Sequence, residues 1–177
     1  RYRNARTPDA PDFEKVMAWL AENLPEDSSF TGIIHNDFKL DNVMVDEAGH
    51  VVAVFDWDMA TLGDPLIDLG TTLAYWSQPT DLPYRIFMDN PLLHGGFLTR
   101  AGLVDRYRAG TGLDLSGLRW YEVFAFFKIA VIVQQIYARY KKGLTRDPRF
   151  AGLLDDAVAV QVRPDRLFEH TRHVSLD

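Results

Sequence analysis

Four polar side chains between residues 35 and 56 have the types and the spacing to bring a base and metal ligands together. His35, Asp37 and Asn42 lie in one polar loop between two apolar runs, and Asp56 follows a third apolar run that ends at Phe55. A positioned carboxylate can accept a proton from a reacting hydroxyl, and hard oxygen ligands are those that Mg²⁺ prefers. The sequence therefore favours a site in which Asp37 acts beside a metal that Asn42 and Asp56 can bind.

A β-hairpin is the element that must close this site. Residues 42–45 and 50–55 are short apolar runs, and the sequence Asp46-Glu47-Ala48-Gly49 between them is typical of a turn. The hairpin predicts that the chain returns Asp56 to the loop that carries Asp37.

The order of these residues resembles the catalytic loop of protein kinases, in which an Asp two residues after a His is followed by an Asn. The chain is similar to the aminoglycoside phosphotransferase and choline kinase-like superfamily, and most to the branch related to kinase-like domains fused to acyl-CoA dehydrogenases. Three motifs carry the resemblance: His35 to Asn42, Asp56-Trp57-Asp58, and Gly63-Asp64-Pro65-Leu66-Ile67-Asp68-Leu69.

The resemblance implies an α+β fold like the C-terminal lobe of protein kinases, mostly helical, with a short hairpin carrying the catalytic and metal loops. It implies ATP- and Mg²⁺-dependent transfer of phosphate to a hydroxyl group of a small molecule. Asp37 would be the catalytic base, and Lys39 would neutralise charge on the phosphoryl group. Asn42 and Asp56 would bind the metal and, with it, the nucleotide.

Each of these residues also has an ordinary structural explanation. A loop Asp can close a turn, an Asn can cap a strand, and a loop Lys can simply be solvated. The resemblance gives His35 and Asp68 the structural task of holding the loop. Asp58 and Asp64 could support the metal site, or could serve a turn and a helix N-cap.

A smaller N-terminal lobe, which covers the nucleotide in this family, has no counterpart in the sequence. No Gly-rich phosphate loop and no Walker-type motif occurs in the 177 residues. We therefore interpret residues 1–11 as a linker from a missing N-terminal lobe and residues 12–177 as the kinase-like C-terminal lobe. We expect the fragment alone to be inactive. A non-catalytic kinase-like binding module and a metal-dependent phosphohydrolase are the alternative functions.

Composition and charge limit the partners and the cellular compartment that we expect. The net charge is −6, without a run of Lys and Arg that could follow a phosphate backbone, so nucleic acid is not an expected partner. The absence of Cys excludes a disulfide scaffold and fits a reducing compartment such as the cytoplasm. The longest apolar stretch, residues 123–136, is shorter than the roughly 20 residues of a membrane span, so no membrane is expected. The oligomeric state stays open.

Helical periodicity accounts for most of the remaining chain. The pattern predicts five helices, at residues 12–23, 65–76, 99–108, 118–142 and 150–162. The fourth pattern is apolar around most of its circumference, which is typical of a central buried helix.

Two further groups of polar residues have spacings that could form a site. One stripe of the long helix could line an acceptor pocket or simply face solvent, and it consists of Tyr121, Lys128, Gln135 and Arg139. His170 and His173 have the spacing of metal ligands on a helix, but no third ligand lies nearby in the sequence, so zinc is not expected.

Overall fold

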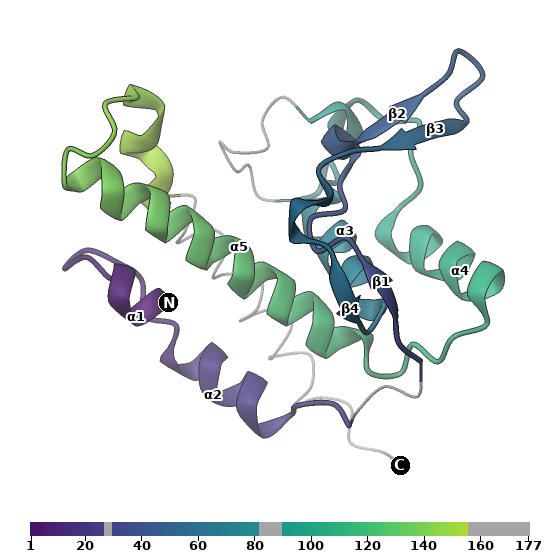
Figure 1. Ribbon diagram of the computed structural model, residues 1–177, viewed down its shortest axis with the longest axis horizontal. Helices are drawn as coiled ribbons and strands as arrows, with labels where there is room; N and C mark the ends of the chain where they lie inside the picture. The colour runs from purple at the N-terminus through teal and green to yellow at the C-terminus, as the bar shows by residue number, and fades with distance from the viewer. Residues whose placement is uncertain (27–29, 82–89, 156–177) are drawn as a thin grey trace. The chain divides into compact units, whose positions relative to one another are not determined.

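The computed structural model describes residues 1–26, 30–81 and 90–155, and the chain divides into two compact units (Figure 1). Unit 1 comprises Arg1–Leu24, Thr80–Asn90 and Val123–Asp177. Unit 2 comprises Pro25–Pro79 and Pro91–Glu122 and therefore contains all four residues of the predicted site.

Two small antiparallel sheets form the β structure of unit 2. Strand β1 (Gly32–Ile34) pairs with β4 (Thr61–Gly63), and β2 (Val43–Val45) pairs with β3 (Val51–Val54). Val43 lies opposite Val54 in the second pair, so the predicted hairpin is confirmed. Figure 1 shows this hairpin as the two strands joined by a single turn.

The hairpin turn is held by one side chain. Asp46 Oδ1 accepts hydrogen bonds from the backbone N–H groups of Ala48 and His50, at 2.9 and 2.8 Å. Gly49 has a φ of 84°, a conformation that glycine adopts without a steric penalty. The sequence Asp46-Glu47-Ala48-Gly49 therefore supplies both the acceptor and the glycine that this turn needs.

Short 3₁₀ helices connect the strands to their neighbours. Helix η1 (Leu40–Asn42) precedes β2, η2 (Trp57–Met59) precedes β4, and η4 (Pro91–His94) lies further along the chain. The first two lie at the two chain segments that carry Asn42 and Asp56.

Two predicted helices of unit 2 begin where the capping signals place them. Helix α3 (Leu66–Tyr75) follows Asp64, whose Oδ1 accepts from the Leu66 N–H at 2.8 Å. Helix α4 (Arg100–Thr111) follows Thr99, whose Oγ1 accepts from the Gly102 N–H at 3.1 Å. These bonds satisfy N–H groups that the first turn of a helix leaves without partners. Thr99 is the N-cap of α4, and Asp64 caps α3 from one residue before the N-cap position Pro65, as the capping alternative for Asp64 predicted.

The core of unit 2 joins α3 to the beginning of helix α5 (Leu118–Lys141). Its buried members are Leu66, Leu69, Leu73, Leu115, Leu118 and Tyr121. Gly70 makes the close approach possible, because a Cβ atom at this position would lie 2.6 Å from the Tyr121 carbonyl oxygen. The opposing atom belongs to the backbone and cannot simply rotate away.

Gly70→Ala is therefore expected to lower the free energy of unfolding by about 1–3 kcal/mol, as overpacked cores do. Gly110→Ala in α4 is the matched control, since a Cβ atom there would meet no atom within 4 Å. That control should stabilise by about 0.5 kcal/mol through helix propensity. Urea denaturation measures both values. Equal stability of the two variants would contradict the close packing at Gly70.

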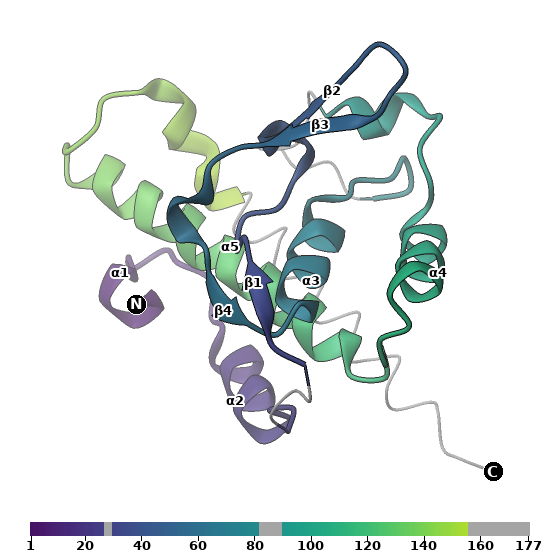
Figure 2. The ribbon, with the colours of Figure 1, turned by 45° about the vertical axis from the view of Figure 1, so that its right-hand side comes forward.

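Unit 1 packs two helices against α5 (Figures 1 and 2). These are α1 (Tyr2–Ala5) and α2 (Glu14–Glu22), the second of which was predicted. The Tyr2 ring is 3% exposed and lies 5.1 Å from the Phe13 ring, edge to face. Residues 1–11, expected as a linker, thus contain a helical turn and contribute a core aromatic residue. The sequence did not predict this helical turn, because residues 1–11 are mostly polar and Tyr2 is the only large apolar side chain among them.

Helix α5 has 24 residues and extends beyond the apolar stretch 123–136 at both ends. Among the described residues it is the one helix long and apolar enough to cross a membrane, with a mean hydropathy of 1.3 over 18 residues, 56% of which are buried. Buried core helices pass the same test. Val133 and Gln134 are fully buried, which supports the predicted central helix.

The polar stripe on α5 has no uniform environment. Tyr121 is 6% exposed, whereas Arg139 faces solvent and Gln135 is half-buried. The solvent-facing interpretation is therefore wrong at Tyr121. Gln135 and Arg139 line an open pocket of about 450 Å³ in unit 1 together with Arg1, Asn4, Ala5, Ala138, Lys142 and Leu144.

The predicted last helix begins with a 3₁₀ turn, η5 (Pro148–Gly152), and residues 153–155 are helical. The rest of that prediction, together with His170 and His173, lies outside the described residues.

Candidate functional site

The loop between β1 and η1 is fastened to α3 through Asp68. Asp68 Oδ2 accepts from the His35 N–H at 2.6 Å, and Oδ1 accepts from the Asn36 N–H at 2.7 Å. A carboxylate that accepts hydrogen bonds from two successive backbone N–H groups fixes both the position and the orientation of that piece of backbone. The anchoring role predicted for Asp68 fits this geometry.

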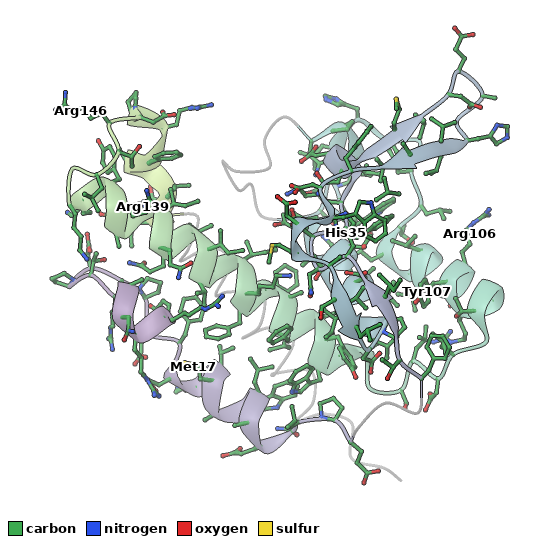
Figure 3. All side chains as sticks on the ribbon, in the orientation of Figure 1. Met17, His35, Arg106, Tyr107, Arg139 and Arg146 are labelled. Atoms are coloured by element: carbon green, nitrogen blue, oxygen red, sulfur yellow. The ribbon has the colours of Figure 1, made fainter. Side chains whose placement is uncertain are left out.

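The His35 side chain ties the same loop to the end of the hairpin. Its ring is 1% exposed, and Nε2 lies 2.7 Å from the Phe55 carbonyl oxygen. Nδ1 lies 3.3 Å from the Asp37 N–H, so it accepts and the proton belongs on Nε2. Both nitrogens are therefore occupied with backbone groups, as a structural His requires. Figure 3 labels His35, which follows β1 on the side nearest the hairpin.

Asp37, Lys39 and Asn42 form one cluster. Lys39 Nζ lies 2.7 Å from Asp37 Oδ2, and the two side chains are 24% and 20% exposed. Asn42 Nδ2 donates to the Asp37 carbonyl oxygen at 2.9 Å and to Asp37 Oδ2 at 3.3 Å. The structure thus brings Lys39 and Asn42 into contact with Asp37, the predicted base.

Asp56 reaches the cluster through the backbone. The Phe55 N–H donates to the Asn42 carbonyl oxygen at 2.8 Å. Asp56 is the next residue after this hydrogen bond, which joins the two strands at the open end of the hairpin. The Asp56 carboxylate is exposed and makes no capping hydrogen bond. The predicted convergence of the loop and the strand end is therefore present in the backbone.

Asn36 and Asp56 share an uncommon backbone conformation. Their φ angles are 66° and 63°, and among the described residues they are the only non-glycine residues with a positive φ. Such conformations carry a steric cost and tend to gather at functional sites. One of these residues precedes the candidate base, and the other is a candidate metal ligand.

The side-chain chemistry of this site fits Mg²⁺. Asn42 uses Nδ2 as a donor to Asp37, which leaves Oδ1 as its ligand atom, and the exposed Asp56 carboxylate supplies hard oxygen atoms. In residues 1–26, 30–81 and 90–155, no three His, Asp or Glu side chains gather as a metal-binding group. Mg²⁺ in phosphate chemistry commonly needs only one or two carboxylates, since phosphates and water complete its shell.

Asp64 and Asp58 have different surroundings. Asp64 Oδ1 caps α3, and Oδ2 accepts from the Tyr121 hydroxyl at 2.5 Å, so both oxygens are used within unit 2. Burial and this bond raise the pKa of Tyr121, which keeps its hydroxyl a donor. Asp58 is exposed in η2. The geometry favours the structural interpretation of Asp64.

Tyr75 is part of the cluster, and sequence reasoning missed it. Its hydroxyl is hydrogen-bonded to Asp37, and its ring lies beneath Lys39, whose Nζ is 5.1 Å from the ring centroid. Burial, and then the charge of Asp37, raise the pKa of Tyr75. A signal was present: Tyr75 follows Asp68 by seven residues, which places both on one face of α3.

Comparison with known proteins identifies the family. The model of the phosphotransferase enzyme family matches residues 1–124, and the chain belongs to this family. A crystal structure of a candidate aminoglycoside phosphotransferase from Ralstonia eutropha superimposes with a TM-score of 0.79 and 28% identity, covering 95% of this chain and 52% of that one. The fold is thus the kinase-like phosphotransferase fold that the motifs predicted.

Curated relatives place the chain near a particular branch. Acyl-CoA dehydrogenase family member 10 from Mus musculus is 33% identical over 146 residues, covering 81% of this chain and 14% of the relative. Acyl-CoA dehydrogenase family member 11 from Homo sapiens is 30% identical over 146 residues, covering 81% and 19%. The chain therefore spans less than a fifth of these relatives. The predicted resemblance to this branch is confirmed.

Proposed function

We propose that the protein is an ATP- and Mg²⁺-dependent phosphotransferase that acts on a hydroxyl group of a small molecule. The cluster at Asp37 supports the proposal: Asn42 and Lys39 contact Asp37 directly, and the hydrogen bond from the Phe55 N–H to the Asn42 carbonyl oxygen places the residue before Asp56 next to Asn42. Asp37 would accept the hydrogen bond of the acceptor hydroxyl and take its proton.

The remaining residues have tasks that follow from charge. Asn42 and Asp56 would hold Mg²⁺, which neutralises charge on the nucleotide phosphates and orients them. Lys39 lies 2.7 Å from Asp37 and so would be close to the phosphoryl group as it moves toward the acceptor. This activity is assigned to the full-length protein, which in this scheme carries a further lobe that covers the nucleotide.

A phosphate-transfer assay tests the proposal. Full-length protein is incubated with γ-labelled ATP and Mg²⁺, with and without a panel of small hydroxyl compounds, and the products are separated. Label in an acceptor supports a phosphotransferase. Free phosphate at equal rates without an acceptor would indicate the phosphohydrolase alternative, and nucleotide binding without any turnover would indicate a binding module. Aminoglycosides belong in the panel, but fold similarity alone does not select them.

The metal assignment gives a separate prediction. Asp56→Asn keeps a residue type that tolerates a positive φ and removes one negative charge. The Mg²⁺ concentration that supports half-maximal nucleotide binding should rise about tenfold or more. Isothermal titration at several Mg²⁺ concentrations measures it. Glu47→Gln, at an exposed position in the hairpin turn, is the matched control for removal of one negative charge, and an equal effect of both variants would contradict the assignment.

A further inference from the structure

Lys39 is held on two sides. Its ammonium group contacts the Asp37 carboxylate at 2.7 Å and lies 5.1 Å above the centre of the Tyr75 ring. An ammonium over an aromatic face is attracted by the negative face of the ring, and more strongly where water is partly excluded. Both partners of the ion pair are less than a quarter exposed, so this condition is met.

Tyr75 also acts on Asp37 itself. Its hydroxyl hydrogen-bonds the carboxylate that Lys39 and Asn42 contact. One side chain therefore touches the candidate base through its hydroxyl group and the neighbouring cation through its ring. A Tyr hydroxyl with its ordinary pKa of about 10 is already protonated at neutral pH, so Tyr75 is the donor in this hydrogen bond.

A single rigid element supports both parts of the loop. Asp68 near the start of α3 holds the loop backbone, and Tyr75 at the end of α3 contacts the loop side chains. Seven residues of α-helix separate these positions by about 10 Å along the axis. The geometry of helix α3 thus sets the distance between the loop backbone that Asp68 holds and the Asp37 carboxylate that Tyr75 contacts.

We infer that Tyr75 is a positioning residue of the phosphate-transfer site, which fixes Asp37 and Lys39 relative to each other. This inference rests on the proposed function for its catalytic meaning. Tyr75 touches neither the reacting atoms nor the metal in this scheme; it acts through the two side chains that do.

Kinetics of the full-length protein provide the first test. Tyr75→Phe keeps the ring under Lys39 and removes the hydroxyl, and Tyr75→Leu removes both. We expect kcat to fall about tenfold in Tyr75→Phe, the loss of one hydrogen bond to a charged group, and further in Tyr75→Leu, with little change in KM for ATP. Tyr140→Phe in α5 controls for removal of a half-buried hydroxyl. Wild-type kcat in Tyr75→Leu would overturn the inference.

A double-mutant cycle separates positioning from general loosening of the fold. If Tyr75 acts through Asp37, adding Tyr75→Phe to Asp37→Asn should cause no further loss, because the carboxylate that Tyr75 positions is no longer there to take the proton. A full additional tenfold loss in that background would show that Tyr75 does not act through Asp37.

Chemical labelling tests the contact without any activity. Acetylation of Lys39 by an N-hydroxysuccinimide ester, measured by mass spectrometry against exposed Lys15, should be about threefold faster in Tyr75→Leu than in the wild type. Tyr75→Phe should lie between them. An unchanged rate would overturn the inference even in a protein that transfers no phosphate, whereas absence of transfer with faster labelling would refute the proposed function alone.

Discussion

Replacing Asp37 with Asn in the full-length protein is expected to lower kcat for phosphate transfer by about 10²- to 10⁴-fold, the usual contribution of a general base. Asn has nearly the same shape but cannot take the proton of the acceptor. The Asp37 backbone contacts with His35 and Asn42 do not involve the exchanged atoms. Initial rates with γ-labelled ATP and the identified acceptor measure the effect.

The fold should survive this exchange. The ion pair with Lys39 is only partly buried, so its loss should change the free energy of unfolding by about 1 kcal/mol. Asp41→Asn, at an exposed position four residues further on, is the matched control and should keep full activity. Full activity in Asp37→Asn would remove the base assignment and with it the proposed mechanism.

Asp68→Ala is expected to produce the largest loss of stability, about 3 kcal/mol, because two backbone N–H groups lose a charged acceptor together. These are the N–H groups of His35 and Asn36, at 2.6 and 2.7 Å. Urea denaturation gives the free energy of unfolding. In hydrogen-exchange measurements, the exchange rates of these two amides should increase more from wild type to Asp68→Ala than the rates of the remaining amides of unit 2.

Two variants sharpen this result. Asp68→Asn keeps one acceptor oxygen and should fall between wild type and Asp68→Ala. Asp105→Ala on α4 removes an exposed carboxylate from a surface ion pair with Arg108 and should change stability by less than about 0.5 kcal/mol. Unaltered exchange at His35 and Asn36 in Asp68→Ala would show that Asp68 does not hold the loop.

Local signals predicted those parts of the fold that local forces make. The turn at Asp46 and the caps at Asp64 and Thr99 depend on side chains that bond backbone groups two to four residues away. Motif spacing predicted the contact between Asp37 and Asn42. These elements form with little help from the rest of the chain, so a short stretch of sequence is enough to recognise them.

Contacts between distant segments could not be predicted in this way. Tyr2 becomes a core residue only because Phe13 and Phe127 provide a place for its ring. Gly70 matters only because the Tyr121 carbonyl lies opposite. In the sequence Tyr75 is one position of a helical pattern, and the partner of its hydroxyl, Asp37, lies 38 residues earlier in the chain.

The backbone conformation of Asp56 restricts how this protein can change during evolution. At a φ of 63° glycine, Asn and Asp fit readily, whereas β-branched side chains are strongly disfavoured. A lineage that replaced this proposed metal ligand with Gly or Asn would keep a well-folded domain. A descendant without turnover could therefore persist as a folded scaffold, and the residue at position 56 would be the first place to distinguish it from an active relative.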